Sequence, residues 1–254
     1  FSSEVLAKTP TTTASQKSHL TKASNKQVSS KQEYSRNSAK SSSLPDLRKY
    51  PSGTPRKKAF LRTVMPYITS QNAAITAERN WLISKQYQGQ WSPAERARLK
   101  DIAKRYKVKW SGNTRKIPWN TLLERVDIIP TSMVATMAAA ESGWGTSKLA
   151  RNNNNLFGMK CMKGRCTNAP GKVKGYSQFS SVKESVSAYV TNLNTHPAYS
   201  SFRKSRAQLR KADQEVTATA MIHKLKGYST KGKSYNNYLF AMYQDNQRLI
   251  AAHM

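Results

Sequence analysis

Residues 133–143 read MVATMAAAESG, and this stretch decides the fold. Alanine and methionine favour helix, and Thr131 or Ser132 just before the stretch is a candidate to cap its start. The stretch is apolar almost all round, which is typical of a helix buried on every side. Gly143 supplies a stop signal. We therefore predict a buried central helix that ends close to Glu141.

Glu141 is the only carboxylate in this apolar stretch. Burial and the negative end of the helix dipole both raise the pKa of such a carboxyl group. A carboxylic acid that keeps its proton near neutral pH suits the general acid of glycosidic bond cleavage. From this residue alone, a glutamate that reaches into solvent at a frayed helix end remains an open alternative.

Helical patterns continue toward the N-terminus, over residues 56–126. Ser92 is followed by Pro, Ala and Glu, which is a capping box, and it predicts a helix that runs to Tyr106. Another helix is predicted over 120–126. We interpret 56–129 as a helical support segment packed beside a domain of residues 130–254.

Toward the C-terminus the pattern is helical with one exception. Residues 173–179 alternate between polar and apolar side chains after a turn at 168–171, which predicts a short strand and a small β-hairpin lobe. A capping box at 181–184 begins a further helix. Asp213 is predicted to cap the next helix, and the last one covers 235–250. The predicted fold class is therefore mainly α with a small β-hairpin lobe.

The N-terminal part has a different composition. Residues 1–55 are rich in Ser, Thr, Lys and Gln, which predicts a disordered basic tail. Residues 1–7 end in Val-Leu-Ala, a pattern found before secretory cleavage sites, so we interpret them as the end of a signal peptide and expect export. An arbitrary start of the chain is the alternative. The sequence contains no run of about 20 apolar residues, so we predict no membrane-spanning helix.

The chain has 43 Lys and Arg against 13 Asp and Glu, and its formal net charge is +30. Such a charge attracts polyanions, among them nucleic acids, anionic lipids and cell-wall polymers, without choosing among them. The two cysteines, Cys161 and Cys166, are expected to form a small disulfide loop in an exported protein. No histidine lies close to them in the sequence, so we expect neither a metal nor another cofactor.

Several motifs in order resemble the glucosaminidase family, glycoside hydrolase family seventy-three, over residues 130–248. They are ESGWGTS at 141–147, NNLFGMK at 154–160, YSQF at 176–179, HPAY at 196–199 and GYST at 227–230. The resemblance implies a lysozyme-like helical fold with a cleft for N-acetylated sugars. It also implies hydrolysis of the bond after N-acetylglucosamine in peptidoglycan, by a monomeric periplasmic enzyme.

Site residues follow from the same resemblance. Glu141 matches the catalytic acid of the family, and Tyr228 matches an aromatic residue of the catalytic cleft. The positions expected to bind substrate are Trp144, Asn155, Phe157 and Tyr176. For Phe157 a packing role is an equal alternative, and the asparagine run is also compatible with a plain polar loop.

The chain departs from the family at one point. Many members have a second carboxylate in the lobe after NNLFG, but residues 161–178 contain no Asp or Glu. Glu184 follows, and its capping-box position explains it without catalysis. Without a carboxylate at this place, three alternatives remain for the reaction. The acetamido group of the substrate assists, a carboxylate from another part of the chain assists, or the protein is only weakly active. A lytic transglycosylase and a non-catalytic basic wall-binding protein also remain alternatives.

Overall fold

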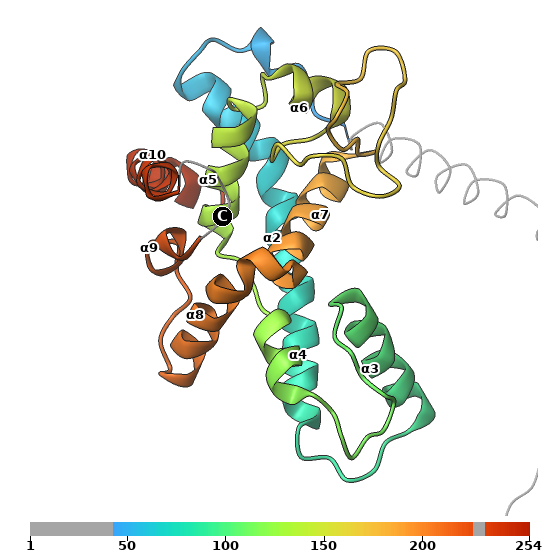
Figure 1. Cartoon of the computed structure of the whole chain (residues 1–254). Coiled ribbons are helices and arrows are strands. Elements are labelled where there is room, and N and C mark those ends of the chain that lie inside the picture. Colours follow the sequence, from blue (N-terminus) through green and yellow to red (C-terminus); the bar gives the residue numbers. More distant parts are fainter. Residues whose placement is uncertain (1–42, 226–231) are drawn as a thin grey trace, which may run out of the picture. The chain divides into compact units, whose positions relative to one another are not determined.

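The computed structural model describes residues 43–225 and 232–254, which are mainly helical (Figure 1). The α-helices are α2 (Thr54–Lys85), α3 (Pro93–Arg105), α4 (Trp119–Arg125), α5 (Thr131–Ser142), α6 (Lys148–Asn153), α7 (Val182–Thr195), α8 (Ser200–Lys211), α9 (Ala218–Met221) and α10 (Lys233–Ala251). Short 3-10 helices are η1 (Leu47–Lys49), η2 (Pro197–Tyr199) and η3 (Ile222–Lys224). No helix in the described ranges is long and apolar enough to cross a membrane.

The predicted central helix is confirmed as α5, which packs against α2 and α10 (Figure 1). Its side chains from Met133 to Ala139 are all buried. Gly143 ends the helix with a left-handed φ of 56°. The predicted side-chain cap is wrong, because Pro130 precedes the helix and the Thr131 hydroxyl instead accepts a hydrogen bond from Asn72 of α2 (3.1 Å).

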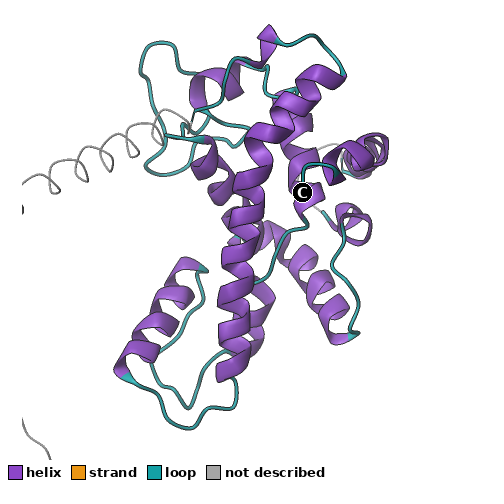
Figure 2. Ribbon diagram, turned by 180° about the vertical axis from the view of Figure 1, so that it is seen from behind, coloured by secondary structure: helices purple, strands orange, loops and turns teal. Residues whose placement is uncertain are grey.

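Helix α2 is the long element of the domain and has 32 residues. It packs against α5 and α7 and extends beyond them to the region of α3 and α4 (Figures 1 and 2). The predicted support segment is thus helical. In α3, the Ser92 hydroxyl accepts from the Glu95 amide (3.1 Å) and the Glu95 carboxylate accepts from the Ser92 amide (3.0 Å), so the predicted capping box is confirmed.

Part of the segment predicted as a tail is folded. Within residues 43–55, Asp46 caps η1 and Leu47 is fully buried in the core. The polar composition hid these few apolar contacts, because Leu44 and Leu47 are the only large aliphatic residues near that point. Residues 1–42, with the predicted signal-peptide end, lie outside the described residues.

The predicted hairpin lobe is not present as a pair of strands. Between α6 and α7 the described residues contain one isolated antiparallel bridge, between Lys160 and Tyr176. Gly171 and Gly175 both have φ near +80°, and these turns break the extended backbone that the alternating side chains suggested. Cys161 and Cys166 form a disulfide in this lobe, as expected.

Two further differences concern the C-terminal half. Asp213 follows the end of α8 with a φ of 52° and caps no helix; Thr217 caps α9 by accepting from the Ala220 amide (3.1 Å). Helix α8 was not predicted. Its buried positions include Arg203 and Arg206, and arginines on the buried face disguise the apolar periodicity.

Candidate functional site

Glu141 lies in the last turn of α5, just before the turn that ends the helix. The neighbouring residue, Ser142, is buried and holds this turn: its hydroxyl donates to the Ala138 carbonyl (2.6 Å) and accepts from the Gly145 amide (2.8 Å). The sequence ESGWG therefore places the carboxylate at a fixed position at the end of the buried helix.

The carboxyl group of Glu141 is partly buried, and this burial raises its pKa. The hydroxyl of Tyr235, on α10, donates a hydrogen bond to Oε1, which stabilises the ionised form and partly opposes the rise. The two effects leave the pKa above its ordinary value. The site thus holds one carboxylic acid that retains its proton to higher pH than a free glutamate.

Gly158 lies against the other oxygen of Glu141. A β-carbon at Gly158 would be 3.2 Å from Oε2, and the residue has a φ of 64°. Any larger residue would therefore crowd the carboxylate and strain the backbone. The close approach brings the loop after α6 to the acid.

Asn155 holds this loop in shape. Its side-chain amide donates to the carbonyls of Met159 (2.8 Å) and Ser177 (3.0 Å), and its oxygen accepts from the Met159 amide (3.0 Å). Only 1% of the residue is exposed. The structure therefore shows a structural role for Asn155, and its contact with substrate stays a prediction.

Phe157 is likewise buried, with 3% of its surface exposed. Its ring stacks on that of Tyr189, with centroids 4.1 Å apart. Of the two roles considered from the sequence, the structure shows packing for this ring, and its contact with a sugar stays a prediction.

Trp144 and Tyr176 remain partly exposed. The ring of Trp144 meets the edge of Phe60 on α2, at 5.5 Å between centroids, and the ammonium of Lys57 lies 5.0 Å from its centre. Tyr176 pairs with Lys160 in the isolated bridge. Both residues are thus only partly buried, and their contact with a sugar stays a prediction. Tyr228, the second predicted catalytic residue, lies outside the described residues.

Glu184 does not offer a second catalytic acid. Its carboxylate pairs with Arg165 (2.5 Å) and accepts hydrogen bonds from the amide (2.6 Å) and hydroxyl (2.7 Å) of Ser180. Burial alone would raise its pKa, but these bonds outweigh burial and lower it. Half of the predicted capping box is confirmed, because the Ser181 hydroxyl accepts from the Glu184 amide (3.1 Å). The Glu184 carboxylate accepts from the Ser180 amide in place of the Ser181 amide.

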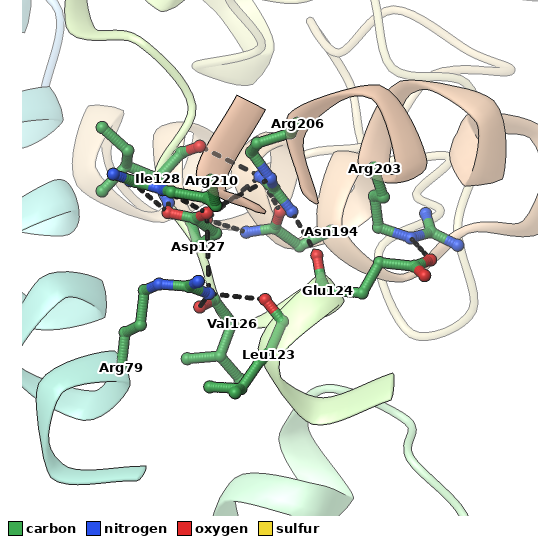
Figure 3. Close-up of polar contacts among 10 residues, drawn as sticks. All are labelled: Arg79, Leu123, Glu124, Val126, Asp127, Ile128, Asn194, Arg203, Arg206 and Arg210. Atoms are coloured by element: carbon green, nitrogen blue, oxygen red, sulfur yellow. Dashed lines mark hydrogen bonds and ion pairs between the residues drawn. The ribbon is translucent and has the colours of Figure 1, made fainter. Parts of the chain in front are cut away.

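Asp127 is committed to a buried ion network (Figure 3). Its carboxylate receives two hydrogen bonds from Arg210 (2.7 and 2.9 Å) and lies near Arg79 (3.5 Å) and Arg206 (3.8 Å). Burial would raise its pKa, but the arginines lower it. Arg79 comes from α2 and the other two from α8, so the network joins the support segment to the C-terminal half.

Arg206 completes this network, and its side chain is fully buried. Its guanidinium donates to the carbonyls of Glu124 (2.7 Å) and Ile128 (2.9 Å) and to the side chain of Asn194 (2.7 Å). Burial lowers its pKa to about 10. These bonds fix the chain that leads into α5.

A cavity of about 280 Å³ lies between α8 and the α9–η3 segment. Leu209 and Met221 form part of its wall, and no residue of the predicted site lines it. Among the residues that the structure describes, no group of three or more His, Cys, Asp or Glu is placed to hold a metal ion.

A helical domain with a carboxyl group of raised pKa at the end of a buried helix has features that suit a glycosidase. The model of the Glucosaminidase family, described as mannosyl-glycoprotein endo-beta-N-acetylglucosaminidase, matches residues 118–248. The chain belongs to this family. The matched range contains α4 to most of α10, including Glu141 and Tyr235. No solved structure matches the chain significantly.

Two contacts of the site were missed from the sequence. From the sequence, Tyr235 was only the first residue of the last predicted helix, and Gly158 was only part of NNLFGMK. Glu141 and Tyr235 are 94 positions apart, and no local pattern pairs residues at that separation. A tyrosine near the start of an amphipathic helix is the one signal that pointed to it.

Proposed function

We propose that the protein is a peptidoglycan hydrolase, an endo-β-N-acetylglucosaminidase that cleaves the glycosidic bond after N-acetylglucosamine. The proposal depends on one observation: the Glu141 carboxyl group has a raised pKa at the end of a buried helix, in a chain of the Glucosaminidase family. The mainly helical domain is consistent with the lysozyme-like fold that the sequence resemblance implies.

In the proposed reaction Glu141 donates its proton to the leaving sugar oxygen. Burial raises the pKa of the group and so favours its protonated form, and Tyr235 orients it through the bond to Oε1. This leaves Oε2, on the side of Gly158, as the oxygen free to carry the proton. Tyr228 and the exposed faces of Trp144 and Tyr176 are proposed to contact the sugar chain.

No second acid accompanies Glu141 among the residues considered, because Glu184 and Asp127 are engaged with arginines. The reaction then favours assistance by the acetamido group of the substrate, which supplies an internal nucleophile. In that scheme a water molecule attacks the resulting intermediate. Glu141, which is ionised after the first step, removes a proton from this water as it attacks.

We also propose that the protein is exported and acts in the periplasm as a monomer. The Cys161–Cys166 disulfide favours an oxidising compartment. The additional helices of residues 56–126 and the stretch 125–130 resemble the Bax protein of enteric bacteria, an exported family member. The high positive charge suits attachment to an anionic wall.

The test compares wild type with Glu141→Gln on purified peptidoglycan. The variant should release no saccharide, whereas its fold should persist, because the amide oxygen of Gln still accepts from Tyr235. Glu215→Gln makes the same change at an exposed position and should retain full activity. Equal release by wild type and Glu141→Gln would refute the role of this acid.

Mass spectrometry of the fragments separates the remaining alternatives. A reducing N-acetylglucosamine end supports the proposed cleavage, and a 1,6-anhydro-muramyl end would identify a lytic transglycosylase. Retention on peptidoglycan with no fragment from the wild type would identify a non-catalytic wall-binding protein.

A further inference from the structure

The chain between Glu141 and Glu184 carries positive charge only. Residues 142–183 contain no Asp or Glu, and their cations are Lys148, Arg151, Lys160, Lys163, Arg165, Lys172, Lys174 and Lys183. Five of them fall within residues 160–174, which we name the basic lobe. Like charges repel, so a concentration of cations in one short loop does not help the loop to fold.

Two of the five charges are used within the protein. Arg165 pairs with Glu184 (2.5 Å), and the ammonium of Lys172 donates to the Asn152 carbonyl (2.7 Å). The other three, Lys160, Lys163 and Lys174, are exposed and make no ion pair with any described residue. Three ammonium groups are thus available to an external anion.

The basic lobe is fixed beside the acid. Lys160 follows Gly158 by two residues, and Gly158 lies against Oε2 of Glu141. The two arms of the lobe are joined where the Cys161 amide donates to the Gly175 carbonyl (3.1 Å), next to Lys174. The Cys161–Cys166 disulfide closes the intervening turn around Lys163. The start of the lobe, at Lys160, is therefore tied to the loop that contacts the acid.

We propose that the basic lobe binds the carboxylate groups of the peptides attached to the glycan strand, an inference that rests on the proposed function. Peptidoglycan carries such peptides on every second sugar, immediately next to the bond after N-acetylglucosamine. Lysine ammonium groups pair with carboxylates through charge-assisted hydrogen bonds. A separate wall polymer is attracted by the net charge of the whole chain and does not require cations at this position.

The test uses the triple variant Lys160→Gln, Lys163→Gln and Lys174→Gln on two substrates. One is peptidoglycan with its peptides. The other is the same glycan after an amidase has removed the peptides and the lactyl carboxylates left by that hydrolysis have been converted to amides. Exposed ion pairs are individually weak, so we expect about a tenfold loss of kcat/KM on the peptide-bearing glycan. On the stripped glycan the rate should equal that of wild type.

The matched control removes three charges elsewhere, by Lys100→Gln, Lys104→Gln and Lys109→Gln, at exposed positions of α3 and its C-terminal end. It should act as wild type on both substrates. An equal loss by the lobe variant on both substrates, or an equal loss in the control, would overturn the proposal.

A measurement of binding, without hydrolysis, makes this test independent of the proposed function. Each variant is also made in the Glu141→Gln background, and its sedimentation with the two glycans is measured. Weaker sedimentation of the lobe variant with the peptide-bearing glycan only would support the proposal even if no hydrolysis occurred. Sedimentation that is insensitive to the peptides but is abolished by a soluble phosphate polymer would overturn it.

Discussion

The hydroxyl of Tyr235 on α10 donates a hydrogen bond to the carboxylate of Glu141 on α5, across 94 positions of the chain. The bond lowers the pKa of Glu141 against the effect of burial. One tyrosine therefore acts both on the orientation of the proposed acid and on the pH at which it holds its proton.

Replacing Tyr235 with Phe should move the alkaline limb of the pH–rate profile to higher pH. The proposed reaction needs protonated Glu141, so activity falls as pH rises through its pKa. Without the hydroxyl the ionised form loses its donor, and the pKa rises further. The kcat should also fall, because the acid is less well oriented. The pH dependence of hydrolysis, measured for wild type and variant, checks this.

Tyr238→Phe is the control for that experiment. Its ring centroid is 6.4 Å from that of Tyr235, and the residue is exposed. Its profile should coincide with that of wild type. A Tyr235→Phe profile that shifts to lower pH would contradict the role given to the hydrogen bond.

Asp127→Asn should lower the free energy of unfolding by about 3–5 kcal/mol, because it leaves three arginines around an uncharged group in the interior. Urea denaturation at pH 7 measures this. Asp101→Asn, an exposed member of an i,i+4 pair with Arg105, should cost less than about 1 kcal/mol. Similar losses for both variants would show that the network in Figure 3 adds little.

The effect of Asp127 should also depend on pH. Its pKa in the folded protein lies below the ordinary value of 3.8, so its contribution is complete above about pH 4 and is lost as pH falls further. The difference in stability between wild type and Asp127→Asn should therefore shrink in acid. A difference that stays constant down to pH 2 would be inconsistent with this ionisation.

Phe157→Leu should weaken the fold without changing the KM of the folded enzyme. The ring stacks on Tyr189 and is buried, so its loss removes packing and leaves the substrate surface intact. We expect a decrease of about 1–3 kcal/mol in the free energy of unfolding. Trp144→Leu is the comparison, because that ring is partly exposed; its KM should rise.

Substitutions of Leu47 and Gly145 should have strongly non-additive effects on the free energy of unfolding. A β-carbon at Gly145 would lie 2.6 Å from Cδ1 of Leu47, and the φ of 79° adds strain. Gly145→Ala should therefore cost about 2–5 kcal/mol, and Leu47→Ala a similar amount through a cavity. The double variant should lose less than the sum, by about 0.5–3 kcal/mol, since the space left by Leu47 accepts the new methyl group. Additive losses would contradict the contact.

The sequence was informative where local rules decide the structure. Helix α5 and the position of Glu141 at its end follow from helix propensity and an apolar surface on all sides. The capping box at Ser92 and the side-chain cap at Ser181 are equally local. In each case the residues that form the feature lie within a few positions of one another.

Features that depend on tertiary contacts were missed or misassigned. The alternation at 173–179 predicted a strand, but glycine turns and a disulfide shape that lobe instead. Nothing in the sequence indicated that Asn155 holds its loop through hydrogen bonds or that Phe157 stacks on Tyr189. The bond from Tyr235 depends on how α10 packs against α5, which no local pattern encodes.

The packing of α5 between α2 and α10 has a practical consequence for dissecting the protein. A fragment limited to residues 118–248 would lack α2 and would expose one apolar side of the helix that carries the acid. Such a fragment should aggregate or stay unfolded when expressed alone. We therefore expect the smallest segment that folds to be longer than the segment that matches the family. Helix α2, which precedes the match, is part of the hydrophobic core that supports Glu141.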